Sequence, residues 1–353
     1  MATENLKIKD IAKALNMSPS TVCRALQGRY NISEATRKKV EEYANEHKYR
    51  PNLFAQSLQN KKTRCIGVVI STVSNTFFSQ VLDGIESITR ENKYFSIVSQ
   101  TNESYEQEVE ITENMAWRCV DGILVSVSSE TQDLSHFRRL QEQGIPVVFF
   151  DRTNDEIITH QVSVDNRGGA YDCVNYMLKE GYKRIAHITS PIHLSTTRER
   201  LCGYQDALTF NNFAVNENYI KYCPHGGKSM AEINEAFTEL MSLPDPPDAI
   251  FTASDRITMG CLKIARDNGY MDNHQLNVAG FSNFDMPSIL DTSITAIQQP
   301  AFEMGQKATE LLLELVDRKG KTPAKYFDNK ILPTSLITGE ELYMMKPLSH
   351  TAS

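Results

Sequence analysis

Aromatic, amide, carboxylate and guanidinium side chains occur in this chain where apolar segments end. Aromatic rings can cover the C–H faces of a sugar, while planar carboxylate, amide and guanidinium groups bind paired hydroxyls. Singly, each has a simpler interpretation, because Phe77 and Phe78 can belong to a core and Asp255 can cap a helix. Together they indicate a site for a small polar molecule. Its residues are Asn75, Phe77, Phe78, Asp151, Arg152, Arg198, Arg200 and Asp255.

The sequence lacks the motifs that would make such residues catalytic. Its glycines form neither a dinucleotide fingerprint nor a P-loop, and its histidines have no Ser or Cys nucleophile in a motif. Asp151 and Asp165 could be a carboxylate pair, but binding of sugar hydroxyls explains them equally well. The seven cysteines stand at scattered spacings without a zinc-type cluster. We therefore expect no enzyme, no cofactor and no metal site.

A second set of polar side chains lies near the N-terminus, in Ser18-Pro-Ser-Thr-Val-Cys-Arg-Ala-Leu-Gln-Gly28. A recognition helix presents short polar and basic side chains to the major groove near its own N-terminus. Arg24 has the fork geometry to contact a guanine, and Ser20 can reach a base edge. An ordinary capped surface helix is the alternative, and the pattern alone does not exclude it.

The distribution of charge favours the DNA-binding interpretation. Residues 1–64 contain 13 Lys and Arg against 6 Asp and Glu, while the remaining residues contain 24 against 38. The net charge of −7 therefore combines a basic N-terminal part with an acidic remainder. Basic surfaces contact phosphates, so DNA is expected at the N-terminal part and not at the rest.

Hydrophobic spacing predicts the elements that position both sets. Ile8, Ile11 and Leu15 share one face of a first helix, Asn16 breaks it, and Ser18 caps a second helix that ends at Gly28. A third helix follows Ser33. Beyond residue 64, buried strands alternate with amphipathic helices, which predicts parallel sheets covered on both faces. The expected strands are 65–72, 94–101, 121–127, 147–151, 162–165, 184–190, 249–254, 277–282 and 331–338.

These segments closely resemble the lactose-repressor (LacI/GalR) family of bacterial transcription regulators, and the match follows the family's order over nearly the whole chain. The segments that carry the resemblance are IKDIAKALNMSPSTVCRAL, NISEATRKKVEEYANEHKYRPN, LFAQSL, GVVIS, VDGILV, IPVVFFDR, VDNRGGA, RERLCGY, VAGFSN and TAIQQPAFEMG. The resemblance implies an all-α helix-turn-helix head and an α/β body, similar to periplasmic binding proteins, of two doubly wound parallel-sheet subdomains.

The resemblance also implies a homodimer on double-stranded, pseudo-palindromic operator DNA. The segment around 52–60 would be a hinge helix that becomes ordered on DNA, with Leu58 in the minor groove, although its apolar residues could instead dock on the body. Cys23 and Gln27 depart from the Ser and Asn common there. The residues expected to contact DNA are Ser18, Pro19, Ser20, Thr21, Arg24, Tyr30, Asn31, Asn52, Leu58 and Gln59.

By the same resemblance, Asn75, Phe77, Phe78, Asp151, Arg152 and Arg200 match residues that line a sugar site, and His225, Ser282 and Gln299 join the expected effector site. Two positions depart from the family. Ser282 stands where many members have an Asp that binds two hydroxyls, and Ser254 stands where Asn is common. The effector is therefore expected to be a sugar, a larger derivative of one, or a different small molecule.

The expected layout is a DNA-binding domain over 1–51, a hinge and linker over 52–64, a body over 65–340 and a tail over 341–353. The body divides into one subdomain of about 65–160 plus 292–322 and another of about 161–291 plus 323–340. The tail has no leucine heptad, so a dimer is expected rather than a tetramer.

No apolar run is long enough to span a membrane and no secretory signal is apparent, so we expect a cytoplasmic protein without a membrane partner. The main function expected is a transcription regulator, most simply a repressor, that a small-molecule effector controls allosterically. A transport-type binding protein without a DNA role is the alternative. The basic head and the missing export signal argue against it.

Overall fold

The computed structural model describes residues 6–26, 32–49, 62–117, 120–271, 276–283, 295–318 and 326–338. The chain divides into two units, Met1–Thr63 and Arg64–Ser353, which we call the head and the body. Each unit buries hydrophobic residues in a core of its own. Most of the expected hinge and the whole expected tail lie outside the described residues.

The head contains three helices with the turn that the sequence predicts. Asn16 has a φ of 52°, in the left-handed region that Asn adopts at low cost. The backbone N–H of Thr21 donates to Ser18 Oγ at 3.1 Å, so Ser18 caps the second helix as expected. Gly28 lies outside the described residues. The helices are α1 (Ile8–Ala14), α2 (Pro19–Leu26) and α3 (Glu34–Glu46).

One cluster of apolar side chains joins the three helices of the head. Ile11 of α1, Val22 and Ala25 of α2 and Val40 of α3 are all fully buried. These positions lie on the inner faces that helical spacing predicts. The packing fixes α2 with its remaining side chains outward, which is the orientation a recognition helix needs.

The body is built on two six-stranded sheets, each part of a lobe. The first lobe has the strand order β11-β5-β4-β3-β1-β2. Its strands are β1 (Cys65–Ile70), β2 (Phe95–Gln100), β3 (Gly122–Val125), β4 (Val147–Phe150), β5 (Gln161–Val164) and β11 (Asn329–Leu332). Its helices are α5 (Thr76–Glu91), α6 (Tyr105–Trp117), α7 (Ser135–Glu142) and α12 (Ala301–Arg318).

The second lobe has the strand order β12-β10-β9-β8-β6-β7, in which only β12 runs antiparallel to its neighbour among the described strands. Its strands are β6 (Ile185–Thr189), β7 (Ile220–Tyr222), β8 (Ala249–Thr252), β9 (Asn277–Phe281), β10 (Ala296–Gln298) and β12 (Ser335–Ile337). Its helices are α8 (Asn166–Lys179), α9 (Ser195–Phe210), the 3₁₀ turn η1 (Glu217–Tyr219), α10 (Met230–Met241) and α11 (Asp255–Asp267).

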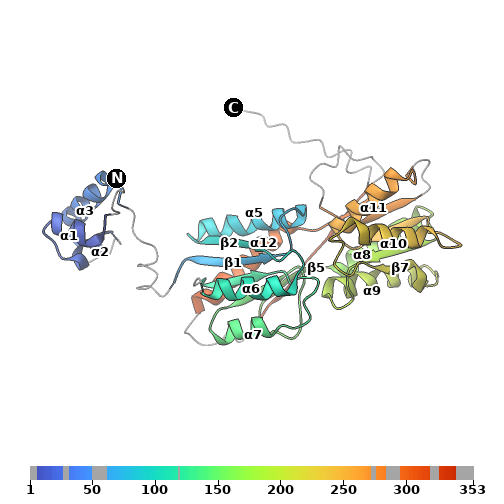
Figure 1. Ribbon diagram of the computed structural model, residues 1–353, viewed down its shortest axis with the longest axis horizontal. Helices are drawn as coiled ribbons and strands as arrows, with labels where there is room; N and C mark the ends of the chain where they lie inside the picture. The colour runs from blue at the N-terminus through green and yellow to red at the C-terminus, as the bar shows by residue number, and fades with distance from the viewer. Residues whose placement is uncertain are drawn as a thin grey trace, which may run out of the picture. The chain divides into compact units, whose positions relative to one another are not determined.

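The near-continuous apolar strands of the first lobe are explained by burial on both faces of its sheet. Val68 packs in the cluster formed with α5 and α12, whereas its neighbour Val69 packs in the cluster formed with α6 and α7. Figure 1 shows α5 and α6 on opposite sides of β1. The predicted parallel α/β architecture is confirmed.

Helices α5 and α12 approach so closely that two glycines are required. A Cβ atom on Gly84 would lie 2.0 Å from the backbone oxygen of Phe302. A Cβ atom on Gly305 would lie 2.1 Å from the backbone oxygen of Val81. Since backbone cannot yield as a side chain can, any larger residue at either position would push the helices apart.

Three segments lie in the lobe opposite to the one expected, so the predicted subdomain boundaries are wrong. Strand β5 belongs to the first sheet and β10 to the second, and the closing segment is two strands, β11 in the first sheet and β12 in the second. The chain crosses between lobes directly after β5, β10 and β11 in the part that the structure describes. Hydrophobic alternation reveals strands but not which sheet each one joins.

A histidine in the core of the second lobe should make the body sensitive to acid. His187 of β6 is fully buried against the rings of Tyr204 and Phe251, and burial lowers its pKa to about 4. Between roughly pH 6.5 and 4 the unfolded chain therefore binds a proton that the folded chain does not. The free energy of unfolding should fall by about 3 kcal/mol as the pH decreases through this window and then level off with respect to this group.

Denaturant unfolding at several pH values measures this effect. His187→Phe keeps the ring stacking but cannot take up the proton. The slope of its unfolding free energy against pH should therefore be smaller, by an amount that corresponds to the uptake of up to one proton on unfolding. Equal slopes for the variant and the wild type between pH 6.5 and 4 would contradict the assignment.

Candidate functional site

The outer face of α2 presents the polar side chains expected to contact DNA. Ser18, Pro19, Ser20 and Arg24 are exposed, and Thr21 is half-buried. Ser18 Oγ lies 2.8 Å from the hydroxyls of both Ser20 and Thr21, which orders this end of the helix. Of the other residues expected to contact DNA, Tyr30, Asn31, Asn52, Leu58 and Gln59 lie outside the described residues.

The two lobes of the body meet along the carboxyl ends of their strands, where several side chains link one lobe to the other. Asn283 Nδ2 donates to Gln80 Oε1 at 2.8 Å. His193 Nε2 lies 2.7 Å from the backbone oxygen of Ser129. The polar groups expected from the strand-end rule therefore gather in one interlobe region.

A hydrogen bond and a histidine–carboxylate contact add to these links. The backbone N–H of Thr153 donates to Ser195 Oγ at 3.0 Å. His225 Nδ1 lies 3.3 Å from Glu130 Oε1, and both side chains remain partly exposed. The interlobe contacts thus extend from the buried strand ends out to the surface of the body.

Arg152 is held in this region by a carboxylate that the sequence analysis did not select. Its guanidinium donates to both oxygens of Glu103, at 2.7 and 3.0 Å, and to the backbone oxygen of Val127. Glu103 also accepts from the N–H of Ser129 at 2.7 Å. Although burial alone would raise the pKa of Glu103, Arg152 and the hydrogen bonds lower it overall. The pair is therefore ionised and internally satisfied.

Arg200, on α9, is buried in the second lobe. Its guanidinium donates to Asn166 Oδ1 at 2.8 Å, to Gln299 Oε1 at 3.0 Å and to the backbone oxygen of Ala253, and it stacks on the ring of Phe281. Burial lowers its pKa to about 10, so it stays charged at neutral pH. Its hydrogen bond holds Gln299, another expected site residue, which lies on the segment that crosses between the lobes after β10.

Asp151 lies at the end of β4 with a φ of 60°, an uncommon conformation for a residue other than Gly or Asn. Burial raises the pKa of its carboxyl group, while Arg152 and Arg200 oppose that rise. Ser126 Oγ donates to Asp151 Oδ2 at 3.2 Å. Strained residues persist where the surrounding structure holds them, often at binding sites.

Asp255 and Ser282, both predicted site residues, are directly hydrogen-bonded to each other. Ser282 Oγ donates to Asp255 Oδ1, and the backbone N–H of Asn283 approaches the same oxygen at 3.4 Å. Ser254, not Asp255, caps α11, because its side chain accepts from Ile257 N. The carboxylate at this strand end thus comes from α11, while the position expected from the family to carry a carboxylate, Ser282 after β9, supplies a hydroxyl.

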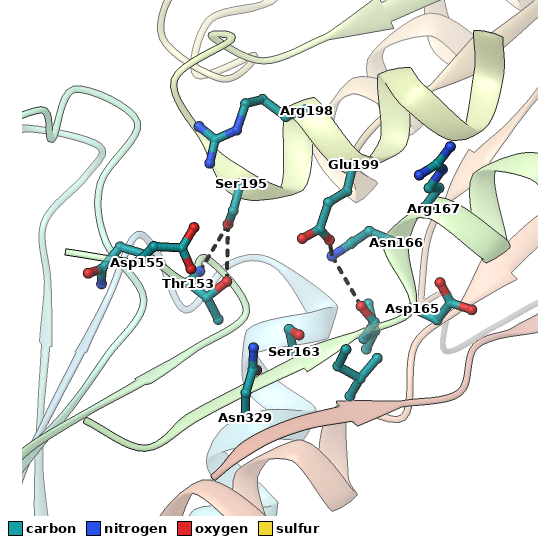
Figure 2. Close-up of a pocket in the computed structure, with 13 residues that line it drawn as sticks. Thr153, Asp155, Ser163, Asp165, Asn166, Arg167, Ser195, Arg198, Glu199 and Asn329 are labelled. Atoms are coloured by element: carbon teal, nitrogen blue, oxygen red, sulfur yellow. Dashed lines mark hydrogen bonds between the residues drawn. The ribbon is translucent and has the colours of Figure 1, made fainter. Parts of the chain in front are cut away.

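Two cavities adjoin these groups, and both reach the first turn of α9. One has a volume of about 420 Å³ and is lined by Arg152, Arg198, His193, Thr131 and Gln132, among others. The other, of about 310 Å³, is lined by Ser163, Asn166, Arg198, Glu199 and Asn329, among others. Figure 2 shows Ser195 of α9 beside Thr153 and Glu199 of α9 beside Asn166, with Ser163 and Asn329 on the facing strands. Such volumes suit a small polar ligand.

Of the predicted effector residues, only Arg152 and Arg198 line these cavities. Phe77 and Phe78 are only 3 % exposed and pack in the core of the first lobe, so their rings have the packing role. Asn75 caps α5 by accepting from Phe77 N at 2.9 Å. His225 is exposed and paired with Glu130. Helical spacing could have identified both rings as core.

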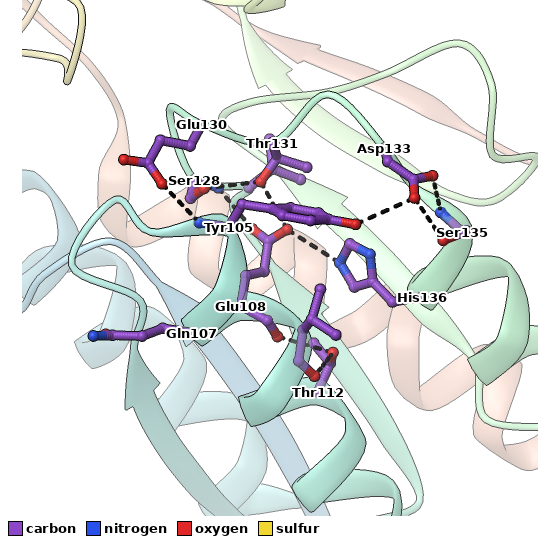
Figure 3. A network of polar contacts seen from close by, with 12 residues as sticks. Tyr105, Gln107, Glu108, Thr112, Ser128, Glu130, Thr131, Asp133, Ser135 and His136 are labelled. Atoms are coloured by element: carbon purple, nitrogen blue, oxygen red, sulfur yellow. Dashed lines mark hydrogen bonds and ion pairs between the residues drawn. The ribbon is translucent and has the colours of Figure 1, made fainter.

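A second buried carboxylate fixes the loop that follows β3. Glu108 accepts from the N–H of Ser128 at 2.7 Å and from Thr131 Oγ1 at 2.8 Å, and lies 3.1 Å from His136 Nε2. Figure 3 shows the Glu108 carboxylate directed at these three residues. Glu108 and Glu103 bind the N–H groups of consecutive residues, Ser128 and Ser129, so this loop is held rigidly against the interlobe region.

Sequence reasoning missed Glu103, Asn166 and Asn283, although each follows a strand that it predicted. The strand-end rule would have found all three had it been applied to every strand rather than to those with aromatic or guanidinium neighbours. Glu108 and Gln80 lie within helices, and no spacing in the sequence indicates their roles.

Comparison with known proteins decides the family. Residues 7–52 match the family described as bacterial regulatory proteins, lacI family, and residues 66–322 match a periplasmic binding protein domain. A probable HTH-type transcriptional regulator from Paenibacillus polymyxa is 33% identical over 88% of this chain and 91% of its own length. The chain belongs to the LacI family. It is a DNA-binding transcription regulator and not an enzyme.

Other relatives and solved structures agree with this assignment. The transcriptional repressor CytR of Escherichia coli is 31% identical over 87% of this chain and 89% of its own length. A putative ribose operon repressor from Burkholderia thailandensis superposes with a TM-score of 0.68 at 26% identity, over 78% of this chain and 99% of that one. The lac repressor dimer bound to operator shares the fold, with a TM-score of 0.80 at 22% identity over 95% and 98% of the two chains. Within the described residues, no helix has the length and apolarity to cross a membrane.

Proposed function

We propose that this LacI-family regulator is a homodimeric repressor whose affinity for a pseudo-palindromic operator is controlled by a small polar molecule bound between the lobes of its body. The observation that carries the proposal is the pairing of an exposed recognition face on α2 with a polar interlobe region that adjoins two ligand-sized cavities. A ligand-controlled regulator needs both a surface that recognises DNA and a site that binds an effector.

The lining of the larger cavity supports a polar, hydroxyl-rich effector such as a sugar or sugar derivative. Thr131, Gln132 and Thr153 provide hydroxyl and amide groups, and Arg198 provides an exposed guanidinium. Planar and hydroxyl groups of this kind exchange hydrogen bonds with paired hydroxyls. A sugar proposed for this chain would bind chiefly through these groups, because the Phe77 and Phe78 rings are committed to the core.

The edge of the first sheet supports the homodimer. Strand β2 forms this edge, and its Phe95, Ile97 and Val98 are 67%, 40% and 39% exposed. An exposed apolar edge strand invites pairing and is normally protected in a monomer. A second copy of the chain packed against β2 would cover these side chains.

The connections between lobes support allosteric control. Because the chain crosses between them three times in the described part and many side chains link them, a ligand bound there changes the free energy of one lobe arrangement relative to another. The resulting coupling to DNA is reciprocal, so the effector changes operator affinity by the same factor as the operator changes effector affinity. An effector affinity that is identical with and without operator would exclude this mechanism.

The recognition role of α2 is tested with Arg24→Ala. Loss of a bidentate base contact should weaken operator binding by about 1–3 kcal/mol, roughly 5- to 150-fold, and relax sequence preference at one base pair. Binding to an unrelated fragment should change much less. Operator fragments are first selected from genomic DNA. Gel-shift titrations at fixed salt then measure the affinity for the operator, for its base-pair variants and for an unrelated fragment.

Lys13→Ala is the matched control, because Lys13 is an exposed cation on α1 rather than on α2. It removes the same charge but should affect operator and unrelated DNA alike. If Arg24→Ala also weakens binding to operator and to unrelated DNA by the same factor, Arg24 makes no base-specific contact. Rise of transcription from the operator promoter when the regulator is absent would establish repression.

A further inference from the structure

We infer that the carboxylate of Glu103 sets the ligand class of the interlobe site, making it a site for uncharged polar molecules that rejects anions such as phosphate esters. This inference rests on the proposed function and specifies which ligands that site accepts. Glu103 does so by occupying the guanidinium of Arg152, the group that would otherwise bind an anion.

Glu103 is enclosed by both lobes. It follows β2 of the first lobe, and its side chain is 3% exposed. From the second lobe, Gly226 faces it: a Cβ atom there would be in ordinary van der Waals contact, 3.8 Å from Glu103 Oε1 and 3.7 Å from Ser190 Oγ. The Glu103 carboxylate therefore lies inside the space between the lobes and not on an outer surface.

The backbone around Glu103 adopts a conformation that sequence alone would not favour. Asn102 and Glu103 have φ values of 50° and 63°, and whereas Asn tolerates this left-handed conformation, Glu rarely adopts it. This geometry aims the carboxylate at the guanidinium of Arg152. A strained backbone is retained where its surroundings hold it, which here are Arg152 and the N–H of Ser129.

Two guanidinium groups lie at this carboxylate. Arg152 forms a two-pronged pair with Glu103, and Arg256 Nη1 lies 3.9 Å from Glu103 Oε1. Guanidinium forks are the groups that bind phosphate and carboxylate bidentately. The Glu103 and Asp151 carboxylates face the same group of cations, and Glu108 adds a further negative charge near Arg152.

An anion entering this space would find the guanidinium of Arg152 already paired with the Glu103 carboxylate. In a region shielded from water, like charges repel strongly, so the anion would have to displace Glu103 and leave it unpaired. An uncharged polyhydroxyl molecule has no such conflict and can use the hydroxyl and amide groups of Thr131, Gln132 and Thr153 beside it. Arg198 also lines the cavity, but its guanidinium is exposed to water, which weakens its attraction for an anion, and the exposed carboxylates of Asp155 and Glu156 line the same cavity. The interlobe site is thus selective by charge.

Glu103→Gln tests this directly in the full-length protein. The amide keeps the shape of the side chain and can accept one hydrogen bond from Arg152, but it no longer balances the charge of Arg152 and Arg256. Inorganic phosphate is the probe. We expect no saturable binding to the wild type at about 10 mM phosphate, and saturable binding to the variant that raises its melting temperature by on the order of 5 °C.

Glu130→Gln is the matched control, because Glu130 stands on the adjoining loop, where its carboxylate contacts His225 and accepts from the N–H of Tyr105. It should give no phosphate binding. Glu103→Ser is a second variant, since its short side chain leaves the space that an anion would fill. Folded Glu103→Gln or Glu103→Ser protein that shows no phosphate response overturns the inference.

Measurement on the wild type does not depend on either variant folding. Saturable phosphate binding to the wild type that Arg152→Gln abolishes also overturns the inference. Operator binding is measured in parallel. If no operator fragment is bound, the proposed function fails, whereas operator binding together with an unfavourable phosphate result removes only the charge selectivity.

Discussion

A chain that begins at Arg64 is expected to lose operator binding by at least about 10³-fold while its body stays folded. The head and body are separate units with separate cores, and the break falls between Thr63 and Arg64. The N–H of Arg64 donates to Asp121 Oδ2 at 2.9 Å, so a chain starting there keeps its anchoring contact with the body. The remaining acidic surface repels DNA and offers no recognition helix.

Gel-shift titration of the truncated and full-length chains measures the loss, and thermal unfolding checks that the body is intact. An effector identified with the full-length chain should still stabilise the truncated one, because both lobes remain. Retention of specific operator binding by the truncated chain would contradict the assignment of DNA recognition to the head.

Replacing Arg200 by Met should lower the free energy of unfolding by about 3–5 kcal/mol. The guanidinium is 5% exposed and satisfies acceptors on Asn166, Ala253 and Gln299. Met fills much of the volume above the Phe281 ring but donates no hydrogen bond, so three buried acceptors lose their partner. Since Gln299 lies on a crossing between lobes, effector binding should weaken as well.

Arg198→Met is the matched control two residues away. Arg198 is exposed and donates to the backbone oxygen of His193 at 2.6 Å, so its replacement should change stability by less than about 0.5 kcal/mol. Denaturant unfolding of both variants separates the two cases. Equal stability losses would show that the buried hydrogen bonds of Arg200 contribute little.

The sequence predicts the helices and strands of this protein better than it predicts which strands pair with one another. Alternation of apolar strands and helices shows a parallel α/β body because burial on both faces leaves a clear pattern, as in β1. The same pattern cannot say that β5 stays in the first sheet while α8 lies in the second lobe, because a crossing takes only Asp165 between them. Sheet membership depends on pairing distant in sequence.

The site was predictable where chemistry follows a strand end. Asp151, Arg152 and Arg200 were found in this way and lie together. Phe77 and Phe78 were expected at the same site, but their rings pack in the core of the first lobe, because an aromatic ring after a strand can face either a ligand or a core and only packing decides. Glu103 was missed because the strand-end rule was not applied to the strand before it, although its pairing with Arg152, 49 residues away along the chain, could not be read from the sequence.

The three crossings have a consequence for how the protein is made. The first lobe receives its sixth strand from β11 (Asn329–Leu332), and the second lobe receives its sixth strand from β12 (Ser335–Ile337). Neither lobe can therefore complete its sheet until the final part of the chain has left the ribosome, whereas the head is synthesised first and needs no later residue for its core. A regulator interrupted during synthesis would carry a finished DNA reader without a finished sensor.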